Sequence, residues 1–314
     1  MTALDSARLN DAHCHFFSAG FFTALAQDPA APRAADPAVA LPEALGWDPP
    51  GDPSQLADRW VAELDRHGVG RAALMASVPG DEASVAAAVA RHPSRFAGLF
   101  MVNPTAPGTE EGVRRGFGEH GLRCACLFPA MHRFALDDEC VTAVFRAAAD
   151  HGCAIFVHCG VLSVGVRRKL GLASRFDVRL GDPLAVARVA SAFPSVPVIV
   201  PHFGAGFLRE TLMAADLAAN IHVDTSSSNG WMKYTPGSSL TDVFRRALAV
   251  LGPERILFGS DSSFFPRGWQ RPVHEAQCAV LDAIDLDPEG RAAILADNFD
   301  RVFGTAGTLS PRTD

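Results

Sequence analysis

Eight short apolar runs alternate with eight longer amphipathic stretches along most of this 314-residue chain. The apolar runs span residues 8–16, 71–77, 96–103, 122–129, 154–159, 196–202, 221–225 and 256–261. Their length and their content of β-branched and aromatic residues are typical of buried β-strands. Parallel strands need helical crossovers, and a closed barrel leaves no unpaired edge. The alternation therefore predicts one α/β domain over residues 1–314, folded as a (β/α)8 TIM barrel.

The amphipathic stretches between the runs supply the crossover helices. They span residues 54–67, 81–91, 109–119, 138–151, 182–193, 206–218, 239–251 and 272–284. In the first of them Leu56, Trp60 and Leu64 recur at helical spacing and so share one face. A doubly wound open sheet is the alternative, but no Gly-x-Gly-x-x-Gly follows the first run to support a nucleotide site.

Composition excludes several classes of partner. With 48% hydrophobic residues the chain can bury a large core, and a net charge of −7 without any Lys/Arg-rich run argues against nucleic-acid binding. No apolar stretch reaches membrane-spanning length, and residues 1–8 lack the apolar core of a signal peptide. The seven cysteines contain no Cys-x-x-Cys pair. They are typical of reduced thiols, so we expect a cytoplasmic protein.

Barrel geometry places catalytic groups at the carboxyl ends of the strands. Those ends carry His13, His15, Ser77, Asn103, His158, His202, Asp224 and Asp261. The other seven histidines, at positions 67, 92, 120, 132, 151, 222 and 274, lie mostly in or beside helices and are interpreted as surface or packing residues. Asp224 is expected to be a further polar group of the rim, without a catalytic role.

Each rim residue has an ordinary structural explanation when it is taken alone. Taken alone, His158 and His202, which end apolar strands, are interpreted as core histidines, and Asp261 as the N-cap of a following turn. The joint occurrence of these residues on one rim is harder to explain in that way. His13 and His15 lie two residues apart, so a strand places both imidazoles on one face, where they suit a borderline-soft divalent metal.

The motifs of this rim resemble those of the amidohydrolase superfamily. The resemblance rests on Asp11-Ala12-His13-Cys14-His15, Val157-His158, Pro201-His202-Phe203-Gly204 and Phe258-Gly259-Ser260-Asp261. It is closest to the amidohydrolase-related branch (amidohydrolase 2), which includes metal-dependent hydrolases and decarboxylases similar to aminocarboxymuconate-semialdehyde decarboxylase. It extends from about Arg8 to Gly304, where Asn298-Phe299-Asp300-Arg301-Val302-Phe303-Gly304 is similar to the Asn-x-x-Arg-x-Phe-Gly ending of that branch.

The resemblance implies a single divalent ion, with zinc as the first expectation and manganese as the second. Its ligands would be His13, His15, His158 and Asp261, and His202 would act beside it as a catalytic base or electrophile. Binuclear members carry a carboxylated lysine or a glutamate at the end of strand four. This chain has Cys124-Ala125-Cys126-Leu127-Phe128-Pro129 there, so one metal is expected. Cys126 is interpreted as a small buried hydrophobe, with a thiolate ligand as the alternative.

A ligand set of three imidazoles and one carboxylate suits a metal that lowers the pKa of bound water from about 15.7 to roughly 7. The first functional hypothesis is hydrolysis of a small amide, ester or lactone by this metal-activated water, with Asp261 as a catalytic proton shuttle. The alternative is non-oxidative decarboxylation of an aromatic or unsaturated acid. A third hypothesis, from another class, is a catalytically silent barrel that only binds a ligand.

Two long loops bear on the substrate. His15 and Ser77 are 62 residues apart, and His158 and His202 are 44 apart. The extra length of the first loop, at about residues 17–53, is predicted to be a lid over the metal, with a tolerated surface insertion as the alternative. The second carries Arg167, Arg168, Lys169, Arg175 and Arg179. One of these, or Arg267, would clamp a carboxylate-bearing small-molecule substrate, and most of the others are interpreted as a solvated basic helix face. Residues 226–231 and 262–269 are predicted to add aromatic walls with polar groups. The resemblance also suggests a homodimer.

Overall fold

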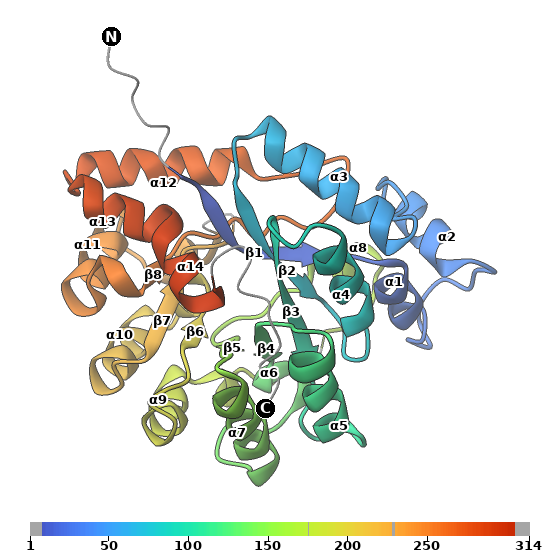
Figure 1. Ribbon diagram of the computed structural model, residues 1–314, viewed down its shortest axis with the longest axis horizontal. Helices are drawn as coiled ribbons and strands as arrows, with labels where there is room; N and C mark the ends of the chain where they lie inside the picture. Colours follow the sequence, from blue (N-terminus) through green and yellow to red (C-terminus); the bar gives the residue numbers. More distant parts are fainter. Residues whose placement is uncertain (1–7, 175, 228–229, 305–314) are drawn as a thin grey trace.

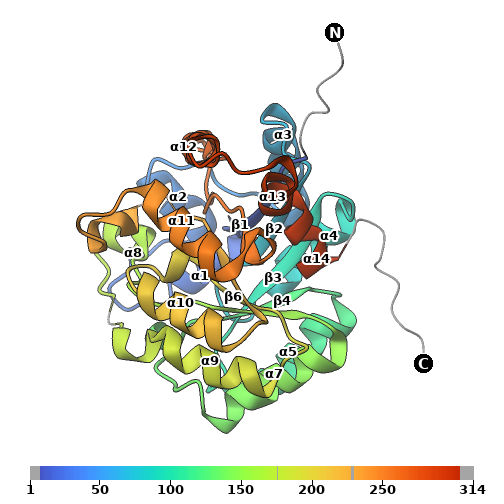
Figure 2. The same ribbon diagram turned by 90° about the vertical axis from the view of Figure 1, so that its left-hand side faces the viewer.

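The computed structural model describes residues 8–174, 176–227 and 230–304, and its centre is a ring of eight parallel strands surrounded by helices (Figures 1 and 2). The strands are β1 (Asn10–Phe16), β2 (Arg71–Ala76), β3 (Phe96–Val102), β4 (Cys124–Leu127), β5 (Ala154–Val157), β6 (Val198–Val200), β7 (Ile221–Asp224) and β8 (Ile256–Leu257). Each strand pairs with the next in chain order. The predicted (β/α)8 TIM barrel is confirmed.

The first strand closes the ring against the segment that follows β8. The Ala12 amide donates to the Phe258 carbonyl at 2.9 Å, and the Asp261 amide donates to the His13 carbonyl at the same distance. The His15 amide donates to the Ser262 carbonyl at 2.7 Å. These bonds hold the two chain regions that carry the first and last rim motifs side by side.

Side chains alternate between the barrel interior and the helical layer. In β2, Ala73 and Met75 join the interior cluster, whereas Leu74 packs outward with Leu56 and Trp60 of α3 (Pro53–Arg66). Because both faces of every strand are buried, the strands read as continuous apolar runs instead of alternating ones. This is why the strand positions could be counted directly from the sequence.

All eight predicted strands are present, but most end earlier than predicted. The run predicted to extend to Asp261 gives a strand of two residues, and the run predicted to extend to His202 gives one of three. His202 and Asp261 have φ angles of 56° and 59°. A left-handed residue cannot continue a strand, so the polar rim residues leave the sheet just as they reach the site.

The eight predicted helices are also confirmed, and shorter ones were missed. The crossovers are α3, α4 (Glu82–Arg91), α5 (Thr109–Arg114), α7 (Glu139–His151), α9 (Pro183–Ala192), α10 (Leu208–Leu217), α11 (Leu240–Leu251) and α12 (Arg271–Ala283). Unpredicted are α1 (Ala19–Leu25), α2 (Pro37–Ala44), α6 (Pro129–His132), α8 (Gly165–Lys169), α13 (Pro288–Ala292) and α14 (Asn298–Phe303). The helix predicted over 109–119 changes to π-helical winding at Arg115–Glu119, and Ala293–Asp297 is also π-helical. Short 3₁₀ turns cover Val178–Gly181, His202–Gly204, Gly230–Tyr234 and Pro253–Arg255.

The insertion after β1 forms a small apolar unit with the β5–β6 and β8 loops. Phe21, Phe22 and Leu41 of α1 and α2 pack in one cluster with Val166 of α8, and Phe264 packs against that cluster. These helices lie on the same side of the barrel in Figure 1. An ion pair of 2.6 Å between Asp28 and Arg167 joins the same two loops.

The carboxyl-terminal motif anchors α14 to β8. The Asn298 amide donates to the carbonyls of Pro253 and Ile256, both at 2.7 Å, and Arg301 donates to the Asn298 side-chain oxygen at 2.8 Å. The Asn-x-x-Arg spacing therefore has a structural purpose at the strand that leads to Asp261. Within the described ranges, no helix has the length and apolarity that crossing a bilayer requires.

Candidate metal centre

Four histidines gather at the carboxyl end of the barrel. β1 presents His13 and His15, His158 follows β5, and His202 follows β6. The centre of the His13 ring lies 5.3 Å from that of His15 and 5.1 Å from that of His202, and the His158 and His202 rings are 5.2 Å apart. The rim prediction therefore brings together residues that are up to 189 positions apart in the sequence.

Asp261 faces the two histidines of β1. Its Oδ1 lies 3.1 Å from His15 Nε2 and 3.9 Å from His13 Nε2. One ligand atom from each of these three residues lies within 4.8 Å of the others, which is the spacing of a shared metal ion. The Asp261 side chain keeps 31% of its surface exposed, so the cluster is accessible from the open end of the barrel.

Ser77 at the end of β2 orients the ring of His15. The Ser77 hydroxyl donates to the Met75 carbonyl at 3.1 Å, and its oxygen lies 2.7 Å from His15 Nδ1. The contact with Ser77 therefore occupies Nδ1 of the His15 ring. Nε2, on the other side of the ring, faces Asp261.

Asp224 at the end of β7 orients the ring of His13. Its Oδ2 lies 2.9 Å from His13 Nδ1, and both residues are buried. Its Oδ1 accepts the amides of His202 at 3.0 Å and of Ser226 at 2.9 Å, together with the Ser226 hydroxyl. A carboxylate that holds the outer nitrogen of a ligating histidine is a common support of metal sites. Sequence reasoning named Asp224 but assigned it no role, although the same strand-end rule that selected the histidines also selected it.

Ser226 connects the two histidines that flank Asp224. Its hydroxyl oxygen lies 2.9 Å from His13 Nδ1 and 2.8 Å from His202 Nδ1, while its proton goes to Asp224. His202 therefore donates through Nδ1 and keeps Nε2 as a free base. Ser226 was predicted only as part of a pocket wall over residues 226–231. Residues 228 and 229 of that wall lie outside the described residues.

The electrostatics of the centre favour a bound cation. Burial opposes ionisation of Asp224, but the charge of His13 and the hydrogen bonds from His13 and Ser226 hold its pKa well below its ordinary value. Burial also opposes ionisation of Asp261, and His15 and His13 outweigh it and lower that pKa. Burial lowers the pKa of His158 and of His202. Burial also opposes ionisation of His13, but its contacts with Asp224 outweigh that effect and raise its pKa. The two carboxylates stay ionised, and a bound divalent metal would take the place of the proton on His13.

A buried network holds the Asp261 loop against β1. Asp11 accepts the amides of His13 and Ser260, each at 3.0 Å, and its other oxygen accepts the Trp269 indole N–H at 2.7 Å. Asp261 lies between these anchors with its left-handed φ of 59°. Such strained residues persist only where the surrounding structure fixes them, and they concentrate at functional sites.

His158 is buried, and its Nδ1 has no hydrogen-bond partner. Phe128 stacks on its ring at 5.3 Å and is the residue that β4 directs to this rim. Cys126 packs in the apolar barrel interior, as expected of a small hydrophobe. His158 belongs to neither of the two ligand clusters found among the described residues, of which the second contains His13, His202 and Asp224.

The donor set fits one divalent ion. Two imidazole nitrogens and one carboxylate oxygen converge, and the ring of His158, whose Nδ1 has no partner, lies 5.2 Å from that of His202. Nitrogen-rich sites of this kind suit zinc, and the carboxylate also suits manganese. His13, His15 and Asp261 are therefore the best-placed of the predicted ligands, and His158 stays a prediction.

The basic residues predicted as carboxylate clamps differ in what they contact. Arg167 pairs with Asp28 and Arg179 pairs with Asp177, both at 2.6 Å, and Arg168 is exposed on α8. Lys169 lies over the rings of Trp47 and Phe264. Arg175 lies outside the described residues. Arg267 contacts the backbone of Asp261 itself.

Comparison with known proteins agrees with this architecture. A family model described as "Amidohydrolase" matches residues 10–305. Among solved structures, the chain is similar to 5-carboxyvanillate decarboxylase from Sphingomonas paucimobilis at 18% identity, with a TM-score of 0.63 and coverage of 95% of this chain and 99% of the other. It is also similar to a probable 2-pyrone-4,6-dicarboxylic acid hydrolase from Acinetobacter baumannii, solved with citric acid bound. That structure is 14% identical, with a TM-score of 0.60 and coverage of 95% of this chain and 99% of the other.

A third similar structure contains a metal. The 5-carboxyvanillate decarboxylase from Novosphingobium aromaticivorans was solved with manganese and 3-methoxy-4-hydroxy-5-nitrobenzoic acid. It is 16% identical, with a TM-score of 0.60 and coverage of 95% of this chain and 97% of the other. At these identities the three structures establish the barrel fold that they share with this chain.

Proposed function

The chain belongs to the amidohydrolase family, and from that premise we propose that it is a mononuclear metal-dependent hydrolase of a small amide, ester or lactone. The observation that carries the proposal is the convergence of His13 Nε2, His15 Nε2 and Asp261 Oδ1 at the open end of the barrel. In this proposal these three residues and His158 hold the ion, with zinc expected before manganese.

The bound ion would supply Lewis acidity and a water that ionises near neutral pH. The chain's own residues would transfer the protons and orient the ligands. Ser226 holds His202 by Nδ1, so His202 Nε2 is the atom that accepts a proton or stabilises a developing oxyanion. Asp261, partly exposed beside His15, would take the proton that the attacking water releases and pass it to the leaving group. Asp224 accepts from His13 Nδ1–H and so leaves His13 Nε2 to bind the ion.

Metal analysis tests this proposal first. Purified protein analysed by inductively coupled plasma mass spectrometry is expected to contain about one zinc or manganese per chain. His13→Ala and Asp261→Ala should both lose that metal, and Asp182→Asn, which changes a helix N-cap residue outside the site, should keep it. Retention of metal in either of the first two variants would contradict the ligand assignment.

A second candidate reaction is the non-oxidative decarboxylation of an aromatic or unsaturated acid. It is favoured by one observation, namely that Arg267 lies beside Asp261 and over the ring of Phe264. Related structures include both hydrolases and decarboxylases, so family membership is compatible with either reaction. Metal-loaded protein should be screened against esters and lactones for acid release and against aromatic acids for CO₂ release. If the protein is a decarboxylase, only the assay for CO₂ release should respond.

We also propose that residues 17–53 form a lid on the single barrel domain. The support is their position: the Phe17 ring lies beside that of His15, with ring centres 5.5 Å apart, and Trp47 contacts the loop that follows Asp261. A surface insertion without function would have no reason to place two aromatic rings over the open end of the barrel. Deletion of this segment should therefore raise solvent access to the centre without removing the metal.

A further inference from the structure

A guanidinium group lies beside Asp261 on the loop after β8. Arg267 Nη2 donates to the Asp261 carbonyl at 3.2 Å and to the Ser263 hydroxyl at 2.8 Å. The guanidinium carbon lies 4.4 Å from the centre of the Phe264 ring. The loop therefore fixes this cation with a carbonyl, a hydroxyl and an aromatic face, next to a predicted metal ligand.

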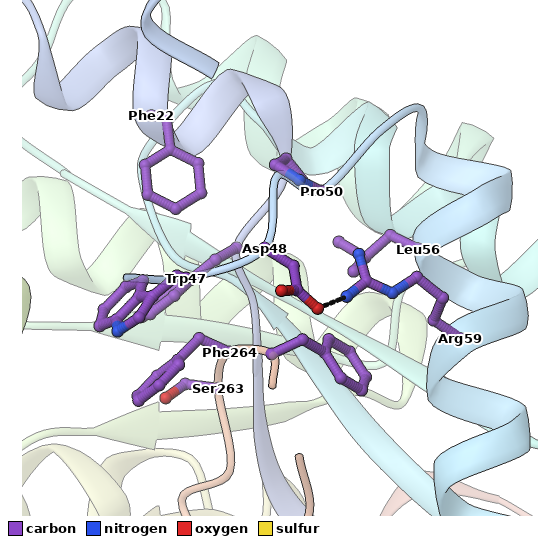
Figure 3. Close-up of a pocket in the computed structure, with 10 residues that line it drawn as sticks. Phe22, Trp47, Asp48, Pro50, Leu56, Arg59, Ser263 and Phe264 are labelled. Atoms are coloured by element: carbon purple, nitrogen blue, oxygen red, sulfur yellow. Dashed lines mark hydrogen bonds and ion pairs between the residues drawn. The ribbon is translucent and has the colours of Figure 1, made fainter. Parts of the chain in front are cut away.

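The insertion supports this arrangement from the other side. Trp47 stacks on Phe264 with ring centres 3.9 Å apart and planes 11° from parallel, and Figure 3 shows the two rings against each other beside Ser263. Trp47 and Arg267 must take opposite faces of Phe264, because both lie at about the thickness of one ring from it. Lys169 Nζ lies 5.4 Å from the centre of Trp47 and 5.6 Å from that of Phe264.

The cationic side chains around the Trp47–Phe264 stack differ in whether a carboxylate neutralises them. Two arginines, of α3 and of α8, are neutralised by carboxylates: Arg59 by Asp48 at 2.8 Å (Figure 3) and Arg167 by Asp28 at 2.6 Å. In the described part of the chain, neither Arg267 nor Lys169 has a carboxylate within ion-pair distance. Arg267 is also exposed. An exposed guanidinium that is held in place and lacks a counterion is a prepared site for an anion.

We propose that Arg267 selects substrates that carry a carboxylate, which it binds through Nη1 beside Asp261. The Nη1 group donates to no acceptor among residues 8–174, 176–227 and 230–304, so its two N–H groups are available. Arg267 is favoured over Lys169 because a planar guanidinium matches a carboxylate, whereas an ammonium acts as a point charge. The inference rests on the proposed function only in placing the substrate beside Asp261.

Calorimetric titration with benzoate and with its neutral analogue benzamide tests the proposal. Zinc-loaded wild-type protein is expected to bind benzoate at least tenfold more tightly than benzamide. Arg267→Met should weaken benzoate binding by tenfold or more and leave benzamide unchanged, since a hydrogen bond to a charged group typically has that strength. Arg267→Lys should recover part of the loss. The matched control Arg168→Met removes an exposed arginine of α8 and should bind both ligands like wild type.

The same titrations on zinc-free protein separate this inference from the proposed function. A metal could bind benzoate by itself, whereas the contribution of Arg267 must persist without metal. Failure to load either zinc or manganese would contradict the proposed function and leave the metal-free comparison to judge Arg267. Equal affinities of wild type and Arg267→Met for benzoate in both forms would overturn the inference, as would a loss seen only with Lys169→Met.

Discussion

Replacement of Asp224 by Asn is the sharpest test of how this centre is built. Asp224 uses Oδ1 to accept two amides and the Ser226 hydroxyl, and uses Oδ2 to accept His13 Nδ1–H. An Asn side chain would keep its oxygen where three donors converge and would turn its NH₂ group toward His13. Two donors would then face each other, and His13 would relieve the conflict by moving its proton to Nε2. That nitrogen could no longer bind a metal.

The expected loss follows from this change of tautomer. Removing an outer-shell partner typically lowers metal affinity by about 10–100-fold, which is about 1.4–2.7 kcal/mol. The smaller value applies if Ser226, whose oxygen is also 2.9 Å from His13 Nδ1, takes over as acceptor. Asp224→Asn combined with Ser226→Ala should therefore lose more affinity than Asp224→Asn alone, since no acceptor for Nδ1–H is then left at that position.

Competition with a chromophoric chelator measures zinc affinity directly, and circular dichroism of the metal-free proteins checks that the fold is kept. Asp182→Asn is the matched control, because it makes the same chemical change at a helix cap outside the centre. Zinc affinity of folded Asp224→Asn within twofold of wild type would refute the role of Asp224. It would also remove the argument that His13 binds through Nε2.

Three further predictions concern stability and are checked by urea unfolding of metal-free protein. Burial lowers the pKa of His222 to about 4, so the native state resists a proton that the unfolded chain accepts near pH 6.5. The free energy of unfolding therefore falls as the pH falls through that window. Between pH 7.5 and 5, wild type should lose about 2 kcal/mol more of it than His222→Gln. Thr211 Oγ1 is buried without a partner, so Thr211→Val should stabilise the fold by about 1 kcal/mol, and a loss would show that the hydroxyl is satisfied. Gly160 has φ of 72°, and a Cβ there would lie 2.1 Å from the Gly204 carbonyl. Gly160→Ala should therefore cost at least about 2 kcal/mol, whereas Gly165→Ala, where the space is open, should be close to neutral.

The barrel could be predicted from the sequence because its strands are buried on both faces. Such strands appear as uninterrupted apolar runs, and each is followed by a helix with an apolar stripe. The short helices α1 and α2 could not be predicted in the same way. They have only seven and eight residues, and α2 contains a proline, so local propensity does not define them. Their apolar residues are stabilised by contacts with α8 and Phe264, which are distant in the sequence.

The site divides along a similar line. His13, His15, His202 and Asp261 could be predicted because strand ends converge in a barrel whatever the details of the loops. The roles of Asp224, Ser226 and Ser77 could not, because each depends on which atom of a histidine faces it. Serine and aspartate at strand ends are also common turn residues, so their types alone carry little information. Only the three-dimensional arrangement distinguishes a hydroxyl that accepts from Nδ1–H from one that caps a turn.

The same backbone feature explains both the overestimated strand lengths and the position of the chemistry. His202, Phe203 and Ala205 have positive φ angles, as does Asp261, although none of these residues is glycine. They lie beyond the last ladder residues of β6 and β8, Val200 and Leu257, and bend the chain across the open end of the barrel. The pattern of apolar residues therefore extends beyond the hydrogen-bonded ladder. Residues of this kind cost roughly 1–3 kcal/mol each, and the Asp224 and Asp11 networks that hold them offset that cost. The buried carboxylates thus stabilise the bends that carry His202 and Asp261 to the centre, and they orient the histidines at the same time.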